Sequence, residues 1–347
     1  VRRQRQSETH EAVQSGEQSI PRDSLVDAPS CETSKGTISA QYNVMFNSIF
    51  ANGYTTGDDL ASAASCTVNA VNSLTGLNIQ NFIVVDFNGL KDMINAIGGV
   101  KICIPSDVKD PYTGLDLTKG LHQLDGLAAT QYARTRYSLG DGSDVQRTTR
   151  QQYLIKQLLQ QALDKNIFTH TSELYQLAKS ALKSLNISQG LADTATLAGL
   201  AMSLKNLNVS HMYTRTLPVV QAPSDPNRVV WDSSADELWT KMREGKPFVE
   251  QPAQDSSSSD SANTNNDSSN TSDQAQDSTP SDQNNAQATP QNTRVADGVE
   301  KTADGKYIDT ATGGEIDTET GAVKDINTGQ VLGISEAYLN NVVCPVQ

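Results

Sequence analysis

The sequence has few histidines, cysteines and aromatic residues, and it has no long apolar run. No segment approaches the roughly 18 consecutive apolar residues of a membrane-spanning helix, and the first residues show no signal-peptide hydrophobic region. As given, the chain is therefore expected to be soluble. Its 4 histidines form no arrangement typical of a Ser/His/Asp or Cys/His nucleophile site, and His122 is best interpreted as a structural histidine. Covalent catalysis by a histidine-activated nucleophile is thus disfavoured.

Cysteine is scarce, and its spacing excludes a common type of metal site. Cys31, Cys66, Cys103 and Cys344 lack the close pairs that a zinc site requires. An even number of cysteines favours two disulfides and an oxidising exterior, whereas free buried thiols in a cytosolic protein are the alternative. The spacing does not choose among the possible pairings. Any fully paired scheme ties Cys344 in the tail to the main part of the chain.

Basic residues are outnumbered, because the formal net charge is -13 and the pI is near 4.7. This balance, together with 5% aromatic residues, argues against nucleic acid as a partner. Of the 347 residues, 36% are hydrophobic, which suffices for a core in part of the chain. Composition divides the sequence into a polar lead-in at 1–18, a main domain at 19–245, a disordered Ser/Asp/Asn/Gln linker at 250–292, and a small tail at 296–347.

Apolar patterning in the main domain predicts alternating strands and helices, which is the signature of a layered α/β fold. Strands are expected at 82–87 (buried), 100–104 and 210–217, and the proline-bearing stretch 218–230 is expected to be a loop. Helices are expected at the following ranges: 42–50, 59–74 closed by Gly76, 91–97 closed by Gly98, 151–163, 172–185, 191–206 and 234–243.

The tail contains an internal repeat. The segments Asp309–Gly313, Asp317–Gly321 and Asp325–Gly329 share the pattern Asp-x-x-Thr-Gly and are separated by short alternating runs. Regularly spaced turn signals of this kind predict a small β-meander. The aspartates could ligate calcium, but turn formation is the preferred interpretation because Asp accepts hydrogen bonds from nearby backbone N–H groups.

Against this acidic background, one short segment concentrates positive charge. Between residues 134 and 150 lie Arg134, Arg136, Arg147 and Arg150, followed by Gln151. Arginines two apart share one side of an extended segment, and arginines three apart are neighbours on a helix. Guanidinium groups bind phosphate oxygens bidentately, so a pyrophosphate is the expected ligand of this segment. The alternative is a solvated, salt-bridged surface with Asp141 and Asp144 as partners.

The motifs around this block favour the phosphate interpretation. They are Ser19-Ile-Pro-Arg22-Asp23, Ile83-Val-Val-Asp86-Phe87-Asn-Gly89 leading to Gly98-Gly99, and Gly120-Leu-His-Gln-Leu124-Asp125-Gly126. With the arginine block, they resemble the LytR-CpsA-Psr family, bacterial extracellular phosphotransferases that attach lipid-linked glycopolymers to the cell wall. The resemblance is to the actinobacterial type, covers about residues 19 to 245 and implies an α/β/α domain with a central mixed sheet. It also strengthens the disulfide interpretation.

The resemblance assigns roles residue by residue. Catalytic roles fall to Arg22, Arg134, Arg136 and Arg147. The pyrophosphate of the lipid carrier would be held by the same four together with Arg150 and Gln151. Asp23 and Asp144 would be supporting residues, with Asp144 fixing the guanidinium forks and lowering their mutual repulsion.

The implied reaction is attack by a cell-wall hydroxyl on the phosphorus next to the sugar, with polyprenyl phosphate leaving. Positioning and charge stabilisation dominate such transfers, so an arginine cage can act without a nucleophilic side chain. The partners would be a polyprenyl-pyrophosphate-linked glycopolymer and an acceptor such as peptidoglycan, at the extracellular face of the membrane of a Gram-positive-type bacterium. The lipid substrate and a missing anchor imply membrane proximity.

The front of the sequence departs from the family pattern. Members carry a membrane anchor and an early strand with Gly-x-Asp, then Arg-Ser-Asp-Thr, before the Ser-Ile-Pro-Arg motif. Here no apolar strand is expected before Ser19, and the nearest echo places Glu8 where an aspartate belongs. The family's magnesium therefore has Glu8 as its one weak candidate ligand. The alternative function is a catalytically impaired polyprenyl-pyrophosphate-binding module.

Overall fold

The computed structural model describes residues 16–164, 185–193, 195–197, 199–200, 213–246 and 292–345. Almost all of the predicted helix at 172–185, most of the helix at 191–206, almost all of the linker and most of the lead-in lie outside these ranges. In the described part, helices and strands mix along the chain as the α/β prediction required. No helix there is long and apolar enough to cross a membrane.

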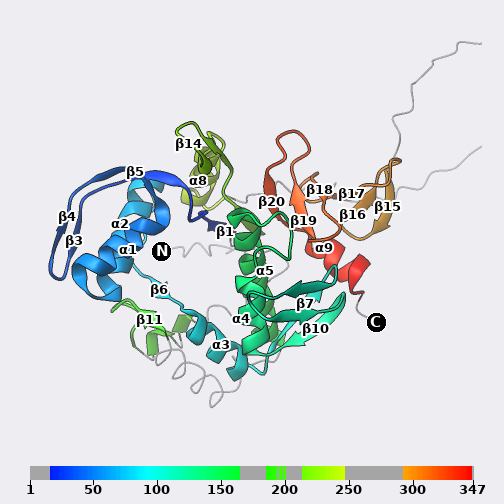
Figure 1. The fold of residues 1–347 in the computed structure, drawn as a ribbon, viewed down its shortest axis with the longest axis horizontal. Helices are drawn as coiled ribbons and strands as arrows, with labels where there is room; N and C mark the ends of the chain where they lie inside the picture. The colour runs from blue at the N-terminus through cyan, green and yellow to red at the C-terminus, as the bar shows by residue number, and fades with distance from the viewer. Residues whose placement is uncertain are drawn as a thin grey trace, which may run out of the picture.

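The N-terminal part places two helices beside short strand pairs, on the left of Figure 1. β1 (Gly16–Ser19) runs parallel to β12 (Tyr213–Thr216), so the end of the predicted polar lead-in is a strand. The elements that follow are β2 (Leu25–Ala28), β3 (Cys31–Thr33), β4 (Gly36–Ile38), β5 (Gln41–Met45), α1 (Phe46–Gly57) and α2 (Leu60–Thr75).

The predicted helix at 42–50 is wrong in its first half. Residues 41–45 pair antiparallel with β2, and the helix begins at Phe46 instead. A distant strand partner thus overrides the local pattern. The helix predicted at 59–74 is confirmed: the Asp59 side chain accepts from the Ser62 N–H at 2.6 Å, and Gly76 closes the helix at φ 67°.

The middle of the chain builds the elements that hold the arginine block. They are β6 (Ile83–Val84), α3 (Phe87–Ala96), β7 (Val100–Ile104), β8 (Val108–Asp110), β9 (Leu115–Leu117), β10 (Gly120–Leu124), α4 (Gly126–Arg134) and α5 (Asp144–Asp164). The strand at 100–104 is confirmed. The strand predicted at 82–87 is present only as β6 and is not buried: Ile83 and Val85 are each 44% exposed, and Asp86 accepts from the Gly89 N–H and starts α3.

The last part of the main domain contains β11 (Asn186–Ile187), β12, β13 (Val219–Ala222), β14 (Asp225–Trp231) and α8 (Ala235–Arg243). The strand at 210–217 and the helix at 234–243 are confirmed within the described residues. The loop predicted at 218–230 is instead an antiparallel hairpin with an irregular register near Ala222. A strand of a two-stranded pair can accommodate Pro226, because one side of each strand needs no ladder donor.

The tail forms the predicted meander. Its sheet has the order β15-β16-β17-β18-β19-β20, with every pair antiparallel. The strands are β15 (Thr293–Ala296), β16 (Val299–Lys301), β17 (Tyr307–Asp309), β18 (Glu315–Ile316), β19 (Ala322–Lys324) and β20 (Val331–Ile334). The short helices α9 (Glu336–Tyr338) and η3 (Leu339–Val343) follow.

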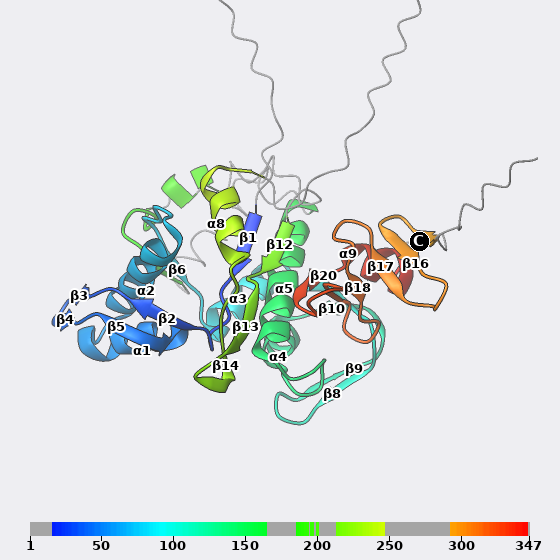
Figure 2. The ribbon, with the colours of Figure 1, turned by 90° about the horizontal axis from the view of Figure 1, so that it is seen from above.

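The main core extends from the central elements into the tail. Ile94, Ile102 and Leu154 are fully buried in the same apolar cluster as Val323 and Leu339 of the tail. Both views show α5 between the N-terminal helices on one side and the tail on the other (Figures 1 and 2). The tail therefore packs on the helix whose first turns carry the arginines.

The two predicted disulfides are present. Cys31 pairs with Cys66, which joins β3 to α2, and Cys103 pairs with Cys344, which joins β7 to the end of the tail. The second bond confirms that Cys344 is tied to the main domain. Since no spacing rule chose this pairing, the tertiary structure decided it.

Candidate anion-binding site

The loop before α5 folds back onto the first turn of that helix. The Ser143 Oγ accepts from the Gln146 N–H at 3.2 Å, as a helix-capping serine does. The Gln146 Oε1 in turn accepts from the Asp141 N–H at 3.1 Å. The spacing Ser-x-x-Gln is a helix-start signal that the sequence carries. It places the beginning of α5 at Asp144, several residues before the predicted start at 151.

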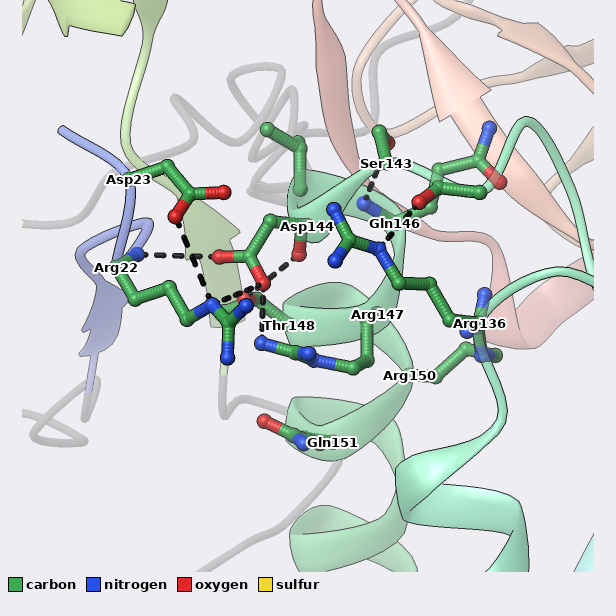
Figure 3. A network of polar contacts seen from close by, with 12 residues as sticks. Arg22, Asp23, Arg136, Ser143, Asp144, Gln146, Arg147, Thr148, Arg150 and Gln151 are labelled. Carbon is green, nitrogen blue, oxygen red and sulfur yellow. Dashed lines mark hydrogen bonds and ion pairs between the residues drawn. The ribbon is translucent and has the colours of Figure 1, made fainter. Parts of the chain in front are cut away.

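Asp144 lies at the centre of a cluster of arginines (Figure 3). Its Oδ2 accepts from the main-chain N–H of Arg22 at 3.1 Å, and its Oδ1 lies 3.4 Å from Arg22 Nε. The same Oδ1 pairs with Nη2 of Arg147, one helical turn away. Its side chain is only 6% exposed. Asp144 thus joins the Ser-Ile-Pro-Arg motif to α5.

Arg22, Asp144, Arg136 and Arg147 form what we call the arginine cluster. The Arg136 guanidinium is directed toward Asp144 in Figure 3, and its Nε donates to the Gly142 carbonyl at 2.7 Å. Asp23 adds a second carboxylate, with Oδ1 3.6 Å from Arg22 Nε. Segments far apart in sequence therefore bring three guanidinium groups together.

The charges in the cluster leave an excess of positive charge. Burial lowers the pKa of Arg147, Asp144 opposes this effect, and the nearby Arg22 and Arg136 lower the pKa further. Arg147 Nε is buried without a hydrogen-bond partner in the described part of the chain. Three guanidinium groups face two carboxylates, so an anion with several oxygens would relieve the repulsion and supply acceptors.

Gln151 lies one turn beyond Arg147, on the same side of α5 (Figure 3). Its Nε2 donates to the Ala133 carbonyl at 3.0 Å, at the end of α4. Positions four apart share a helix face. The structure therefore places Gln151 at the edge of the arginine cluster.

Arg134 lies at the end of α4 and is exposed. Its guanidinium carbon is 5.1 Å from the centroid of the Phe87 ring, at the start of α3. No polar contact with Asp144 is present among the described residues. Phe87 belongs to the motif Ile83–Gly89, whose sequence does not reveal its role; in the structure its ring supports the Arg134 guanidinium.

Arg150 occupies a different position from the one expected for a pyrophosphate ligand. It is only 4% exposed and points away from the side of α5 that carries Arg147 and Gln151 (Figure 3). Its Nη1 donates to the Leu139 carbonyl at 3.0 Å, and its Nη2 donates to the Thr135 carbonyl. Its terminal nitrogens are thus engaged by the protein itself.

The described residues include no group of three or more His, Cys, Asp or Glu side chains that could hold a metal ion. Asp23 and Asp144, the carboxylates nearest the site, are both paired with guanidinium groups. Glu8, the candidate magnesium ligand, lies outside the described residues. His122 has its Nε2 2.7 Å from the Thr118 carbonyl oxygen, a local contact that suits a structural histidine.

Comparison with known proteins supplies several relatives. "Cell wall biosynthesis protein LcpA" of Corynebacterium glutamicum is 26% identical over 253 residues, which is 70% of this chain and 48% of that protein. "Probable cell wall biosynthesis protein LcpB" of the same organism is 29% identical over 229 residues, 65% of this chain and 49% of that protein. These relatives bear out the predicted actinobacterial type. The chain spans about half the length of each.

A relative that matches a shorter part of the chain is "Polyisoprenyl-teichoic acid--peptidoglycan teichoic acid transferase TagU" of Enterococcus faecalis. It is 28% identical over 121 residues, 35% of this chain and 39% of that protein. Among solved structures, protein gbs0355 of Streptococcus agalactiae shares the fold, with a TM-score of 0.53 and 19% identity over 66% of this chain and 73% of that one.

A family as a whole also matches this chain. The LytR_cpsA_psr family matches residues 10–244, which include the motif around Arg22, the arginine block and the hairpin after β12. The match covers more than half of the sequence and agrees with the motifs quoted above. The chain therefore belongs to the LytR_cpsA_psr family.

Proposed function

We propose that this chain transfers a glycopolymer from a polyprenyl-pyrophosphate carrier to a hydroxyl group of a cell-wall acceptor such as peptidoglycan. The observation that carries the proposal is the pairing of Arg22 and Arg147 with Asp144, with the Arg136 guanidinium directed toward the same carboxylate and more positive than negative charge in the cluster. A pyrophosphate supplies the missing negative charge and several acceptor oxygens. The name of the Enterococcus relative, a polyisoprenyl-linked polymer transferase, supports the same class of donor.

In this proposal the arginines act by position and charge. An acceptor hydroxyl attacks the phosphorus next to the sugar and forms a new phosphorus–oxygen bond, the bond from that phosphorus to the bridging oxygen breaks, and polyprenyl phosphate leaves. The proton of the hydroxyl group passes to solvent. Charge grows on the bridging and outer oxygens during this step, and preorganised guanidinium groups stabilise it. Arg147 and Arg136 would contact the pyrophosphate from one side, Arg22 from the other, and Gln151 and Arg134 at the edges.

Magnesium remains a family-based prediction that the described residues do not fit. Magnesium in phosphate sites is usually held by one or two carboxylates together with the substrate. Here both nearby carboxylates, Asp23 and Asp144, are paired with arginines. No step of the proposed reaction is routed through the metal.

The proposed location is the extracellular face of the cell membrane, where a lipid-linked donor and the cell wall meet. Two disulfides suit an oxidising compartment. The polyprenyl chain of the donor would keep the reaction close to the membrane.

Calorimetric titration with geranyl pyrophosphate, paired with an assay for phosphate release, tests the proposal. We expect Arg147→Ala and Arg136→Ala each to weaken binding roughly 10- to 100-fold, because charge-assisted hydrogen bonds are worth about 1.5 to 3 kcal/mol. Arg147→Lys should recover little, since it loses the bidentate fork. Binding should change little when magnesium is omitted.

The matched control is Arg294→Ala, which removes an arginine side chain that is 70% exposed on the tail sheet. It should bind like the wild type. Unchanged affinity in both cluster variants would refute the assignment of the site. Tight binding without phosphate release would instead favour the alternative, a catalytically impaired binding module.

A further inference from the structure

Arg150 is an arginine of the block that faces the interior of the domain rather than the arginine cluster. Its two terminal nitrogens donate to the carbonyls of Thr135 and Leu139. These carbonyls lie on either side of Arg136 in the sequence. A single buried guanidinium therefore donates hydrogen bonds to both ends of the short segment that carries Arg136.

Burying this guanidinium is costly, and packing alone does not explain it. Burial lowers the pKa of Arg150, and the positive charge of Arg147 lowers it further. Tyr132, Asp141 and Asp110 oppose this effect. Apolar side chains of similar volume often serve a buried site equally well or better. A planar fork with several donors is useful where two carbonyls must be held in a fixed relation.

The carbonyls that Arg150 binds belong to buried residues. Thr135 is fully buried and Leu139 is 4% exposed. A buried carbonyl that loses its donor costs free energy, so the segment would rearrange if the fork were removed. The loop conformation and the buried arginine thus depend on each other.

The rest of the loop is already fixed to α5. Gln146 holds the Asp141 N–H. Gly140, at φ 80°, has no room for a side chain, because a Cβ there would come within 1.5 Å of Gln146 Oε1. Arg136 Nε closes the loop on the Gly142 carbonyl. Arg150 supplies the anchor on the inner side, at the point where the chain leaves α4.

We propose that Arg150 is a positioning residue, which holds the segment from Thr135 to Leu139 so that the Arg136 guanidinium is directed into the arginine cluster. The inference rests on the proposed function, because it assigns Arg150 a role in pyrophosphate binding that is exerted through Arg136. Arg150 itself does not touch the pyrophosphate. Arg147, held by Asp144 on the opposite side of α5, does not depend on it.

A double-mutant cycle with inorganic pyrophosphate as the probe tests this dependence. Arg150→Lys, which keeps the charge but loses the fork, should weaken binding about tenfold. In the Arg136→Ala background the same change should cost less than about twofold, because the side chain that it positions is already gone. In the Arg147→Ala background it should again cost about tenfold. Equal losses in the Arg136→Ala and wild-type backgrounds would overturn the proposal.

Arg243→Lys is the matched control for a general loss of stability. Arg243 also donates to a main-chain carbonyl, that of Thr75, but it lies on α8 against the end of α2. We expect Arg243→Lys to lower the Tm while leaving pyrophosphate affinity within about twofold of wild type. A control variant that loses affinity in step with its Tm would mean that Arg150 acts through stability alone, which overturns the positioning role.

Hydrogen exchange of the free protein separates this inference from the proposed function. Arg150→Lys should speed amide exchange in residues 136–143, and Arg243→Lys should not. Unchanged exchange in that loop would overturn the positioning role even if pyrophosphate binds. A wild-type protein that does not bind pyrophosphate would overturn the proposed function, and with it the role of Arg150 in binding, whatever the exchange experiment shows.

Discussion

The arginine cluster and the tail sheet are built in opposite ways. The cluster joins Arg22 to Asp144 across 122 positions of sequence, whereas every strand of the tail pairs with its neighbour in the chain. A meander needs only local turns and short apolar runs. A cluster of like charges needs a folded domain that holds its members against their repulsion. The structure of the tail sheet therefore follows from the sequence of each turn and strand, whereas the arginine cluster depends on contacts between distant segments.

The repeats of the tail are turns that are held by hydrogen bonds between residues close in sequence. Asp317 and Asp325 accept, through Oδ1, from the N–H groups two and three residues ahead. This is the Asx-turn geometry predicted for the repeat. Asp309 departs from it, because its carboxylate accepts from the hydroxyls of Thr312 and Ser335. The first repeat thus binds the tail sheet to its terminal helix.

The two regions meet on α5 and β7. Lys156, about two and a half turns beyond Arg147 on α5, pairs with Glu336 of the tail at 2.8 Å. The Cys103 N–H donates to the buried Tyr153 hydroxyl at 3.4 Å, and Cys103 is bonded to Cys344. The helix that presents the arginines at one end is thus held by the tail further along.

The largest effect is expected from breaking this junction. Replacing Cys103 and Cys344 together with alanine removes a link between residues 241 apart, and loss of that constraint should cost up to about 5 kcal/mol of unfolding free energy. Replacing Cys31 and Cys66, which are 35 apart, should cost about 4 kcal/mol. Guanidinium unfolding of the two double variants compares them. A smaller loss for the Cys103–Cys344 variant would mean that packing and Lys156–Glu336 hold the tail without the bond.

A smaller effect is expected from disrupting the cluster. Asp144→Asn removes the carboxylate charge shared by Arg22 and Arg147, and the partly buried contacts that it weakens are together worth about 2 kcal/mol. The control is Asp116→Asn, which breaks the exposed pair with Lys109 and should cost less than about 0.5 kcal/mol. Similar losses of unfolding free energy in both variants would show that the cluster is no more than a surface ion-pair network.

The smallest effect is expected in the pH dependence of the tail. Burial raises the pKa of Asp309, although its hydroxyl partners oppose this. Since the folded protein then holds the proton more tightly than the unfolded chain, the stability linked to this group is full below the unfolded value near 3.8. It is lost as the pH rises through the folded pKa.

Asp309→Asn, which does not titrate, should flatten this decline when thermal unfolding is followed from pH 3.5 upward, roughly across the range in which an aspartate titrates. The comparison of interest is the slope of unfolding free energy against pH, not its absolute value. Identical slopes for wild type and variant would rule out Asp309 as the source of the dependence.

Sequence patterns predicted the elements whose signals are local. The helix of residues 60–75 has its cap at Asp59 and its glycine at Gly76, and both work as expected. Sequence patterns gave wrong predictions where strand pairing competes with local preference. Residues 41–45 form a strand because they pair with β2. The valines of 219–231 form a hairpin although Pro226 suggested a loop. Secondary structure follows propensity until tertiary pairing outweighs it.

The features of the candidate site also separate into those that the sequence determines and those that depend on tertiary contacts. The sequence by itself determined that four arginines and a glutamine share one segment, and that the motif around Arg22 belongs with them. Only the tertiary structure decided that Asp144 joins Arg22 to Arg147, and that Cys103 pairs with Cys344. It also decided that Arg150 points inward to the carbonyls of the loop that precedes α5. Residue type fixes the charge and donors of a side chain, but the packing of helix and loop fixes the direction in which it points.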